Sequence, residues 1–191
     1  FALTTRHGTE SFRHVVCAVP PWRLPALTAH LPPLAKAARQ AAALSYQPIY
    51  TVYLRYPPAA RLAHAFIGVE IFGRVQWVFD RGATHGQAGL MAVVLSAEGA
   101  HTKLAHDALA RTVGAALAPH VAPAGLAPHW QQVVAEKRAT FACTPGLARP
   151  SQTTPLPGFH LAGDYTAGDY PATLEGAVQS GVACARAITG G

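Results

Sequence analysis

The segment at residues 158–188 constrains the fold most, because its pattern predicts a strand, a turn and a helix in immediate succession. Residues 158–163 (GFHLAG) predict a short buried strand, residues 164–171 a turn and residues 172–188 a helix. Asp164 follows a glycine at the carboxyl end of the strand, where ligands gather in open α/β sheets. Its carboxylate can accept hydrogen bonds from ribityl or ribose hydroxyls. We therefore expect a ligand to bind at this turn.

The start of the same helix is suited to electron-rich groups. Pro171 precedes the helix, and its fixed φ favours helix entry. The first N–H groups, at residues 173–175, have no partner within the helix and carry its positive partial charge. They could meet the N1 and C2 carbonyl edge of a reduced flavin. A plain, tightly packed C-terminal helix explains the same pattern equally well.

Small residues form two rows along this helix at i, i+4 spacing: Gly176, Ser180 and Cys184, then Ala177, Gly181 and Ala185. Each of the two glycines costs about 1 kcal/mol relative to alanine in a helix interior. We therefore expect a sheet or a cofactor to approach this helix closely.

The rest of the chain predicts a mixture of strands and short helices. Pro32 and Pro33 split an Ala- and Leu-rich segment into two helices, and residues 144–157 are a Pro-rich loop. A further helix is expected at residues 101–117, with Leu104, Ala108, Val113 and Leu117 on its apolar side. Strands are expected at residues 1–5, 12–19, 45–56, 66–72, 74–80, 88–96 and 130–141. Residues 1–5 need a neighbouring strand, and the first residue is Phe, so we expect a missing N-terminal portion.

Composition limits the class of protein. The 191 residues are 50% hydrophobic and 13% charged, enough for one substantial core or parts of two. No apolar run reaches the roughly 18 residues of a membrane span, and residues 1–10 lack a signal-peptide pattern, so we expect a cytoplasmic protein.

The cysteines and histidines do not predict a metal site. The three cysteines have no CxxC spacing, so we expect them to be buried small side chains, and the sequence contains no HExxH motif.

The positive charge is concentrated in residues 11–69, which contain no acidic residue and six basic ones: Arg13, Arg23, Lys36, Arg39, Arg55 and Arg61. A solvated basic surface explains this, and so does contact with anionic lipid or a diphosphate. Nucleic acid is not expected, because aromatic residues do not interleave with the basic ones. The Ala- and Leu-rich residues 22–44 fit either core packing or docking on a membrane surface.

Residues 161–181 (LAGDYTAGDYPATLEGAVQSG) closely resemble the C-terminal FAD-binding motif of flavin amine oxidases, phytoene desaturases and their relatives. The resemblance implies FAD as the cofactor. It implies that Gly163 and Asp164 contact the ribityl and diphosphate region. By the same match the flavin ring lies among the residues at the helix start: Pro171, Thr173, Leu174, Glu175 and Ala177.

Two further segments extend the resemblance. Residues 14–21 (HVVCAVPP) are similar to the family's strand and turn that return to the FAD domain, which implies Ala18 and Pro20 near the cofactor. Residues 136–150 (EKRATFACTPGLARP) resemble the segment before the last FAD motif in squalene-related and carotenoid desaturases.

The fold implied is α/β and α+β: the C-terminal part of an amine oxidase-type, Rossmann-like flavoenzyme with an inserted mixed-sheet substrate domain. Residues 1–20 would be returning strands of the FAD-binding domain, residues 21–150 the substrate-binding domain and residues 151–191 the last FAD-binding strand and helix. The family's GxGxxG unit does not occur here. We therefore expect the missing N-terminal FAD-binding half as a partner, and a chain that alone is poorly folded or free of flavin.

Residues 50–56 (YTVYLRY) and 76–82 (QWVFDRG) resemble the squalene-associated branch, which removes the hydroxyl of hydroxysqualene. This implies a polyprenyl lipid substrate and a reduced flavin that delivers hydride. The proton would come from Asp80, from water held by Arg81, or from Tyr170, although a strand-end ion pair also explains the first two. The alternatives are a phytoene or carotene desaturase, and an inactive fragment that needs a partner half.

Overall fold

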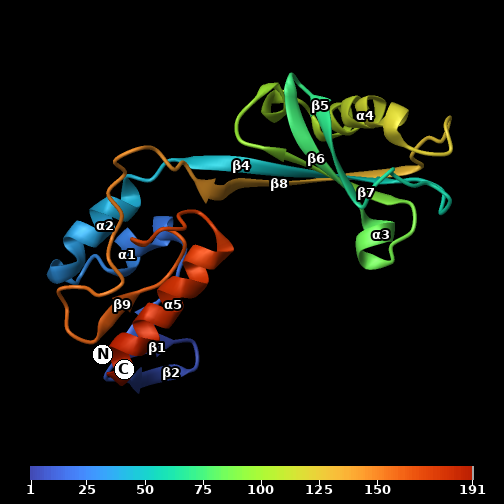
Figure 1. Cartoon of the computed structure of the whole chain (residues 1–191). Coiled ribbons are helices and arrows are strands. Elements are labelled where there is room, and N and C mark those ends of the chain that lie inside the picture. The colour runs from blue at the N-terminus through green and yellow to red at the C-terminus, as the bar shows by residue number, and fades with distance from the viewer. Residues whose placement is uncertain (191) are drawn as a thin grey trace. The chain divides into compact units, whose positions relative to one another are not determined.

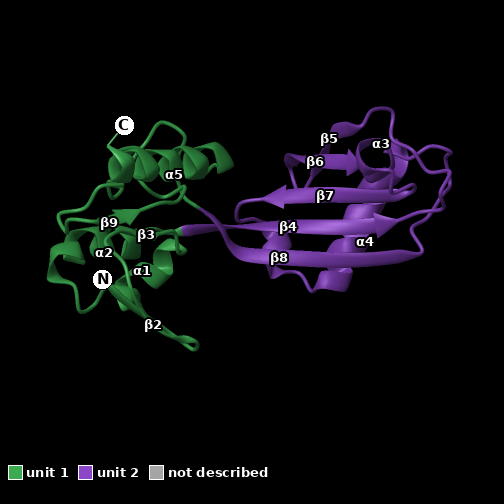
Figure 2. Cartoon of the chain, turned by 90° about the horizontal axis from the view of Figure 1, so that it is seen from below, with its two compact units in different colours: residues 1–45, 141–191 green, residues 46–140 purple. Residues whose placement is uncertain are grey.

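The computed structural model describes residues 1–190, which form two compact units (Figure 2). Unit 1 contains both ends of the described chain, residues 1–45 and 141–190, and unit 2 contains residues 46–140. These boundaries differ from the expected 20/21 and 150/151, because residues 21–45 and 141–150 pack with the chain ends. The assignment of the predicted domains to FAD and substrate stays a prediction.

The strands of unit 1 form two small sheets (Figure 1). The first is an antiparallel hairpin of β1 (Ala2–Thr5) and β2 (Gly8–Ser11), so the neighbour that residues 1–5 require lies in this chain. In the second, β3 (Val15–Cys17) runs parallel to β9 (Phe159–Leu161). Two segments from opposite ends of the sequence are thereby joined.

The helices of unit 1 follow the sequence pattern. The helices α1 (Leu24–Leu27) and α2 (Ala35–Ala42) are separate, as the proline pair predicted, and Leu24 and Leu34 are buried. The helix α5 (Leu174–Thr189) packs on β9, where the Cys184 thiol donates to the Leu161 carbonyl at 3.2 Å. Of the three cysteines expected to be buried, Cys143 is exposed.

Unit 2 is a five-stranded sheet in the order β5-β6-β7-β4-β8, with one face covered by α4 (Figure 1). The strands are β4 (Tyr46–Arg55), β5 (Phe66–Ile71), β6 (Arg74–Asp80), β7 (Leu90–Ser96) and β8 (Trp130–Phe141). Alternate side chains of the strands point to α4 and form the core, in which Val52, Val78 and Val93 are fully buried. The five strands confirm the predicted extended segments.

Two helical details of unit 2 differ from expectation. The helix α4 (His106–Leu117) begins five residues later than predicted, because Ala100–Lys103 form a 3₁₀ turn. Leu104 therefore precedes the helix. The buried helix positions are Leu109, Ala110, Val113 and Leu117, whereas Ala108 is half-buried. The short helix α3 (Arg81–His85) was not predicted.

Within residues 1–190 no helix is both long and apolar enough to cross a membrane.

His101 is a buried polar group in the core of unit 2. It is 2% exposed, its ring lies 5.4 Å from that of Tyr50 and 6.0 Å from that of Phe72, and its Nε2 has no partner among residues 1–190. Burial lowers the pKa of His101, and a backbone hydrogen bond with Ala97 opposes this only in part. Burial therefore favours the neutral form of the ring in the folded protein.

We predict that acid destabilises the fold through His101. The folded-state pKa lies below the unfolded value of about 6.5, so the unfolded chain takes up the proton first. The contribution of His101 to the free energy of unfolding should be constant above about pH 6.5 and fall as the pH drops toward the lowered folded value. Urea titrations from pH 7.5 to 5 measure this slope.

His101→Phe keeps the ring contacts and should flatten the slope, whereas His64→Gln, at an exposed position, should leave it unchanged. An equal slope in wild type and His101→Phe would contradict the assignment.

Candidate functional site

The turn after β9 is held against α5 by a hydrogen bond that only a close approach permits. The Gly163 N–H donates to the Ser180 hydroxyl at 2.8 Å, and Ser180 is 2% exposed. Gly163 has φ +147°, and a Cβ there would lie 2.6 Å from the Tyr165 ring. A side chain at residue 163 would therefore disturb the turn.

Asp164 is half-buried directly after this glycine. Burial raises the pKa of its carboxyl group, and hydrogen bonds from the Tyr165 N–H and its own N–H oppose the rise. Its backbone carbonyl accepts the Ala172 N–H at 3.3 Å, where Ala172 has φ +57°. The turn thus presents a partly desolvated carboxylate that can accept further hydrogen bonds.

The beginning of α5 is fixed by a side-chain cap. The Thr173 hydroxyl accepts the Gly176 N–H at 3.0 Å and donates to the Tyr170 carbonyl at 2.8 Å. A Cβ at Gly176 would lie 2.0 Å from that same carbonyl oxygen. The helix start therefore packs closely against the turn at residue 170, which explains the glycine at position 176.

The residues predicted around the flavin ring lie at this helix start. Leu174 is 89% exposed, and the Glu175 carboxylate accepts a hydrogen bond from Gln179 at 2.7 Å. The backbone N–H groups of residues 174 and 175 have no acceptor within the helix. Pro171 and Ala177 are half-buried.

The structure brings the two predicted FAD segments together. In the parallel pair of β3 and β9, the Ala162 N–H donates to the Cys17 carbonyl at 3.1 Å. Ala18 and Asp164 therefore follow the carboxyl ends of neighbouring strands, where ligands bind in open α/β sheets. Pro20 is exposed two residues further along.

Two residues that support the turn were missed by sequence reasoning. The Arg149 guanidinium donates to the carbonyls of Thr166 and Gly168, and the Gln152 amide donates to the Thr166 hydroxyl and the Ala167 carbonyl. Both come from the Pro-rich loop. Their signal was their long polar side chains in a loop that otherwise holds small and apolar residues.

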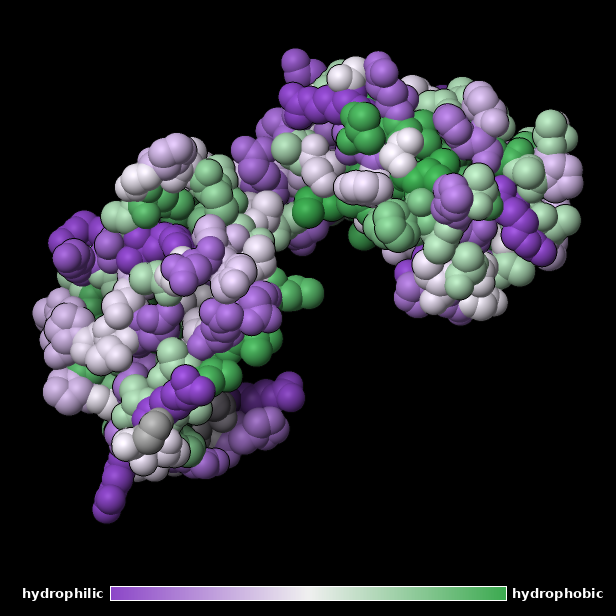
Figure 3. All heavy atoms as spheres, viewed as in Figure 1, coloured by the Kyte–Doolittle hydropathy of each residue, from purple (hydrophilic) through white to green (hydrophobic). Residues whose placement is uncertain are grey.

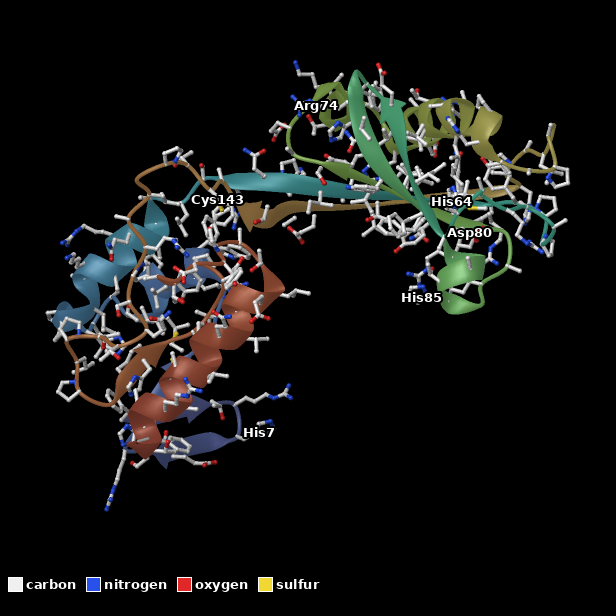
Figure 4. The ribbon with its side chains drawn as sticks, in the orientation of Figure 1. His7, His64, Arg74, Asp80, His85 and Cys143 are labelled. Atoms are coloured by element: carbon white, nitrogen blue, oxygen red, sulfur yellow. The ribbon has the colours of Figure 1, made fainter. Side chains whose placement is uncertain are left out.

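Asp80 belongs to unit 2 and caps α3 (Figure 4). Its Oδ1 accepts the N–H groups of Gly82 and Ala83 at 2.8 and 3.2 Å, and its Oδ2 accepts the Leu62 N–H at 3.1 Å. The side chain is 1% exposed. These contacts favour a structural role, and proton donation by Asp80 stays a prediction.

The remaining candidates for proton transfer lie in different units. Arg81 donates to the side chain of Gln87 at 2.9 Å, so the structure shows it bonded to an amide instead of an acid. Tyr170 lies in unit 1, is 51% exposed, and uses its backbone carbonyl to hold the cap of α5. Its hydroxyl role also stays a prediction.

The groups at the carboxyl ends of β3 and β9 fit a flavin nucleotide. Asp164 would supply an acceptor for ribityl hydroxyls, and the start of α5 would supply donors for a flavin carbonyl. The turn between them is fixed by hydrogen bonds to Ser180, Arg149 and Gln152.

Comparison with known proteins gives one family. The family model of the flavin containing amine oxidoreductases matches residues 1–189. Hydroxysqualene dehydroxylases from Rhodopseudomonas palustris and Sinorhizobium fredii are 33% and 30% identical over 138 residues, which are 71% of this chain and 31% of each relative. The 15-cis-phytoene desaturase of Solanum lycopersicum is 50% identical over 58 residues, 29% of this chain and 10% of that protein.

Solved structures agree in fold. Cyclohexylamine oxidase from Brevibacterium oxydans has a TM-score of 0.65 at 17% identity, covering 98% of this chain and 45% of that one. A putative protoporphyrinogen oxidase from Exiguobacterium sp. has a TM-score of 0.60 at 16% identity, covering 98% and 43%. The chain thus spans less than half the length of the proteins it matches. The matches confirm the predicted fold class and FAD as the predicted cofactor.

Two glycines of α5 give a matched test of the packing. Gly176→Ala should lower the free energy of unfolding by about 1–3 kcal/mol, because its Cβ meets the Tyr170 carbonyl. Gly181→Ala should raise it by about 0.5–1 kcal/mol, because nothing lies within 4 Å and alanine favours helix. Urea unfolding of the complete protein measures both, and equal effects of the two changes would contradict this packing.

Proposed function

Because the chain belongs to the flavin-containing amine oxidoreductase family, as its match over residues 1–189 shows, we propose that it is the C-terminal part of an FAD-dependent oxidoreductase acting on a polyprenyl lipid. The proposed reaction is reductive removal of the hydroxyl of hydroxysqualene to give squalene. The two relatives matched over 71% of the chain carry the name hydroxysqualene dehydroxylase.

The observation that carries the lipid assignment is the apolar open face of the sheet in unit 2. Side chains that point away from α4 are exposed although many are large and apolar: Phe66 54%, Val75 70%, Trp77 53%, Trp130 47% and Val134 50%. The Phe66 ring lies 5.7 Å from the Trp77 ring and 6.1 Å from the Phe79 ring. Figure 3 shows apolar side chains at the surface of unit 2.

Exposed apolar surface of this kind marks a binding site, because water is in contact with side chains that burial would stabilise. A polyprenyl chain is itself apolar along its length. Aromatic and branched side chains on a sheet offer such a chain apolar contacts without demanding hydrogen bonds.

The proposed flavin contacts come from unit 1. Asp164 would accept hydrogen bonds from ribityl hydroxyls, and Gly163 would let the backbone approach the diphosphate. The N–H groups at the start of α5 would face the flavin carbonyl edge, with Thr173 holding the helix start in place. Ala18 and Pro20 would line the cofactor from the neighbouring strand.

When bound, reduced FAD would supply hydride to the allylic carbon while the C–O bond breaks and the hydroxyl, with one proton, leaves as water. Tyr170 is our preferred proton donor, because its side chain is half-exposed beside the proposed flavin contacts and the Asp80 carboxylate already accepts three N–H groups.

A phytoene desaturase is the second candidate, because a plant phytoene desaturase is 50% identical over 58 residues. In that reaction oxidised flavin accepts hydride, so the two candidates differ in the direction of transfer.

We also propose that a GxGxxG-containing half, outside these residues, binds the ADP part of FAD and packs on unit 1. Apolar side chains at i, i+4 spacing remain exposed on α5: Leu174, Val178 and Val182. An apolar groove of about 790 Å³ is bordered by β1, β3 and residues 27–31. Both surfaces fit contact with another part of an FAD domain. Contact with a membrane stays a prediction.

Flavin retention tests the proposed contact at Asp164. In the complete protein, Asp164→Ala should weaken FAD binding about tenfold or more, because the ribityl hydroxyls lose a charged acceptor. Asp169→Ala, which removes an exposed acid from the same turn, should leave binding unchanged. The flavin to protein absorbance ratio after dialysis measures retention, and full retention in Asp164→Ala would remove this residue from the site.

Substrate choice tests the reaction. Incubation of the complete, FAD-loaded protein with reduced flavin and hydroxysqualene should give squalene, and incubation of the oxidised form with phytoene should give no desaturated product. Mass spectrometry of the extracted lipids measures both. Desaturation of phytoene without formation of squalene would replace the first candidate with the second.

A further inference from the structure

We propose that Tyr53 determines the specificity of the open sheet face in unit 2, by forming a hydrogen bond with the hydroxyl of a polyprenyl alcohol. This inference rests on the proposed function, because it assigns the residue that recognises the polar group of the substrate. The exposed aromatic side chains of the face suit a hydrocarbon chain. A polyprenyl alcohol and the corresponding hydrocarbon share that chain, so a different contact has to distinguish them.

Tyr53 lies on the open face of the sheet. It is in β4, which is placed between β7 and β8 (Figure 2). Its neighbours Val52 and Leu54 are fully buried in the core that α4 covers. Since successive side chains of a strand point to opposite faces, that of Tyr53 points away from α4. The half-buried Tyr53 side chain therefore belongs to the face proposed for the lipid.

Apolar side chains adjoin Tyr53 across the sheet. The strand register places the residues of its row directly opposite one another: Tyr53, Ala92, Phe79 and Phe66. In the next row Thr51 lies opposite Val94, and Val94 lies opposite Trp77. In these two rows the face is apolar from β5 to β7 and carries hydroxyl groups on β4. Tyr53 is thus a polar group at the border of the apolar surface.

The Tyr53 hydroxyl is free to bind a ligand. It forms no hydrogen bond within residues 1–190 and has accessible surface, whereas the Tyr56 hydroxyl is buried. Thr51 also has an unpaired hydroxyl in this part of the chain. Side chains stand roughly perpendicular to a sheet, so a phenol carries its hydroxyl further from the strand than a threonine does. A ligand on the face therefore reaches the Tyr53 hydroxyl first.

A polyprenyl chain on this face changes the surroundings of the Tyr53 hydroxyl. Water satisfies the hydroxyl in the free protein, and an apolar chain displaces that water. A polar group that loses water without gaining a partner weakens binding. The hydroxyl of an alcohol supplies a partner, and a hydrocarbon supplies none. Tyr53 therefore favours the alcohol and disfavours the hydrocarbon that is left when the hydroxyl is removed.

The test compares the binding of hydroxysqualene and squalene to the complete protein with oxidised FAD, which supplies no hydride and so prevents turnover of the alcohol. Wild-type protein should bind hydroxysqualene about tenfold more tightly than squalene. Tyr53→Phe removes only the phenol hydroxyl. It should weaken the binding of hydroxysqualene about fivefold and leave that of squalene equal or tighter. Partition of each lipid between protein and detergent micelles, quantified by mass spectrometry, measures the affinities.

Tyr56→Phe is the matched control. It removes a hydroxyl from the same strand region, but one that is buried and faces α4. The variant should keep the wild-type preference for hydroxysqualene. All variants are compared at equal FAD occupancy, which shows that their folds are retained.

Two results would overturn the inference. One is an equal preference for hydroxysqualene in wild type and Tyr53→Phe. The other is a preference that is lost in Thr51→Val and kept in Tyr53→Phe, which would assign recognition to the neighbouring hydroxyl. If neither lipid binds to the wild-type protein, the proposed function itself is contradicted, so failure of the two claims can be told apart.

Discussion

The parallel pairing of β3 with β9 is the interaction on which the proposed flavin site depends. It joins a strand near the beginning of the sequence to one near its end, and the Ala162 to Cys17 hydrogen bond aligns their carboxyl ends. Everything assigned to the cofactor follows from this alignment. Ala18 follows the carboxyl end of β3, and Asp164 follows that of β9. The helix α5 packs on β9, where Ser180 accepts the Gly163 N–H and Cys184 donates to the Leu161 carbonyl. Without this pairing, residue 18 and the turn at residue 164 would not lie at the same edge of one sheet.

In unit 2, the alternation of side chains along the strands determines which residues are buried and which are exposed. One face of its sheet is sealed by α4, and the other exposes aromatic and branched side chains to water. Natural sheets usually place polar residues on a solvated face. The departure from that rule on β5 and β6 is the basis of the proposed lipid substrate.

Much of the fold could be predicted from sequence because it is encoded locally. The strand, turn and helix at the C-terminal end, the two helices separated by Pro32 and Pro33, and the strands expected at residues 66–72 and 74–80 are all present. What the sequence could not show depends on residues far apart in the chain. Asp80 ends β6 as expected, but the hydrogen bonds that it accepts from Leu62 and the start of α3 follow from the fold. Arg149 and Gln152 brace the turn at residues 166–168 through contacts that no spacing reveals. The boundary at residue 45 likewise reflects packing between chain ends.

The most direct test of the central claim is a crystal structure of the complete protein with FAD bound. The account predicts that an Asp164 oxygen lies within about 2.6–3.2 Å of a ribityl or ribose hydroxyl and that the start of α5 faces the flavin carbonyl edge. A flavin bound elsewhere, with Asp164 facing solvent and the start of α5 contacting only protein, would contradict it.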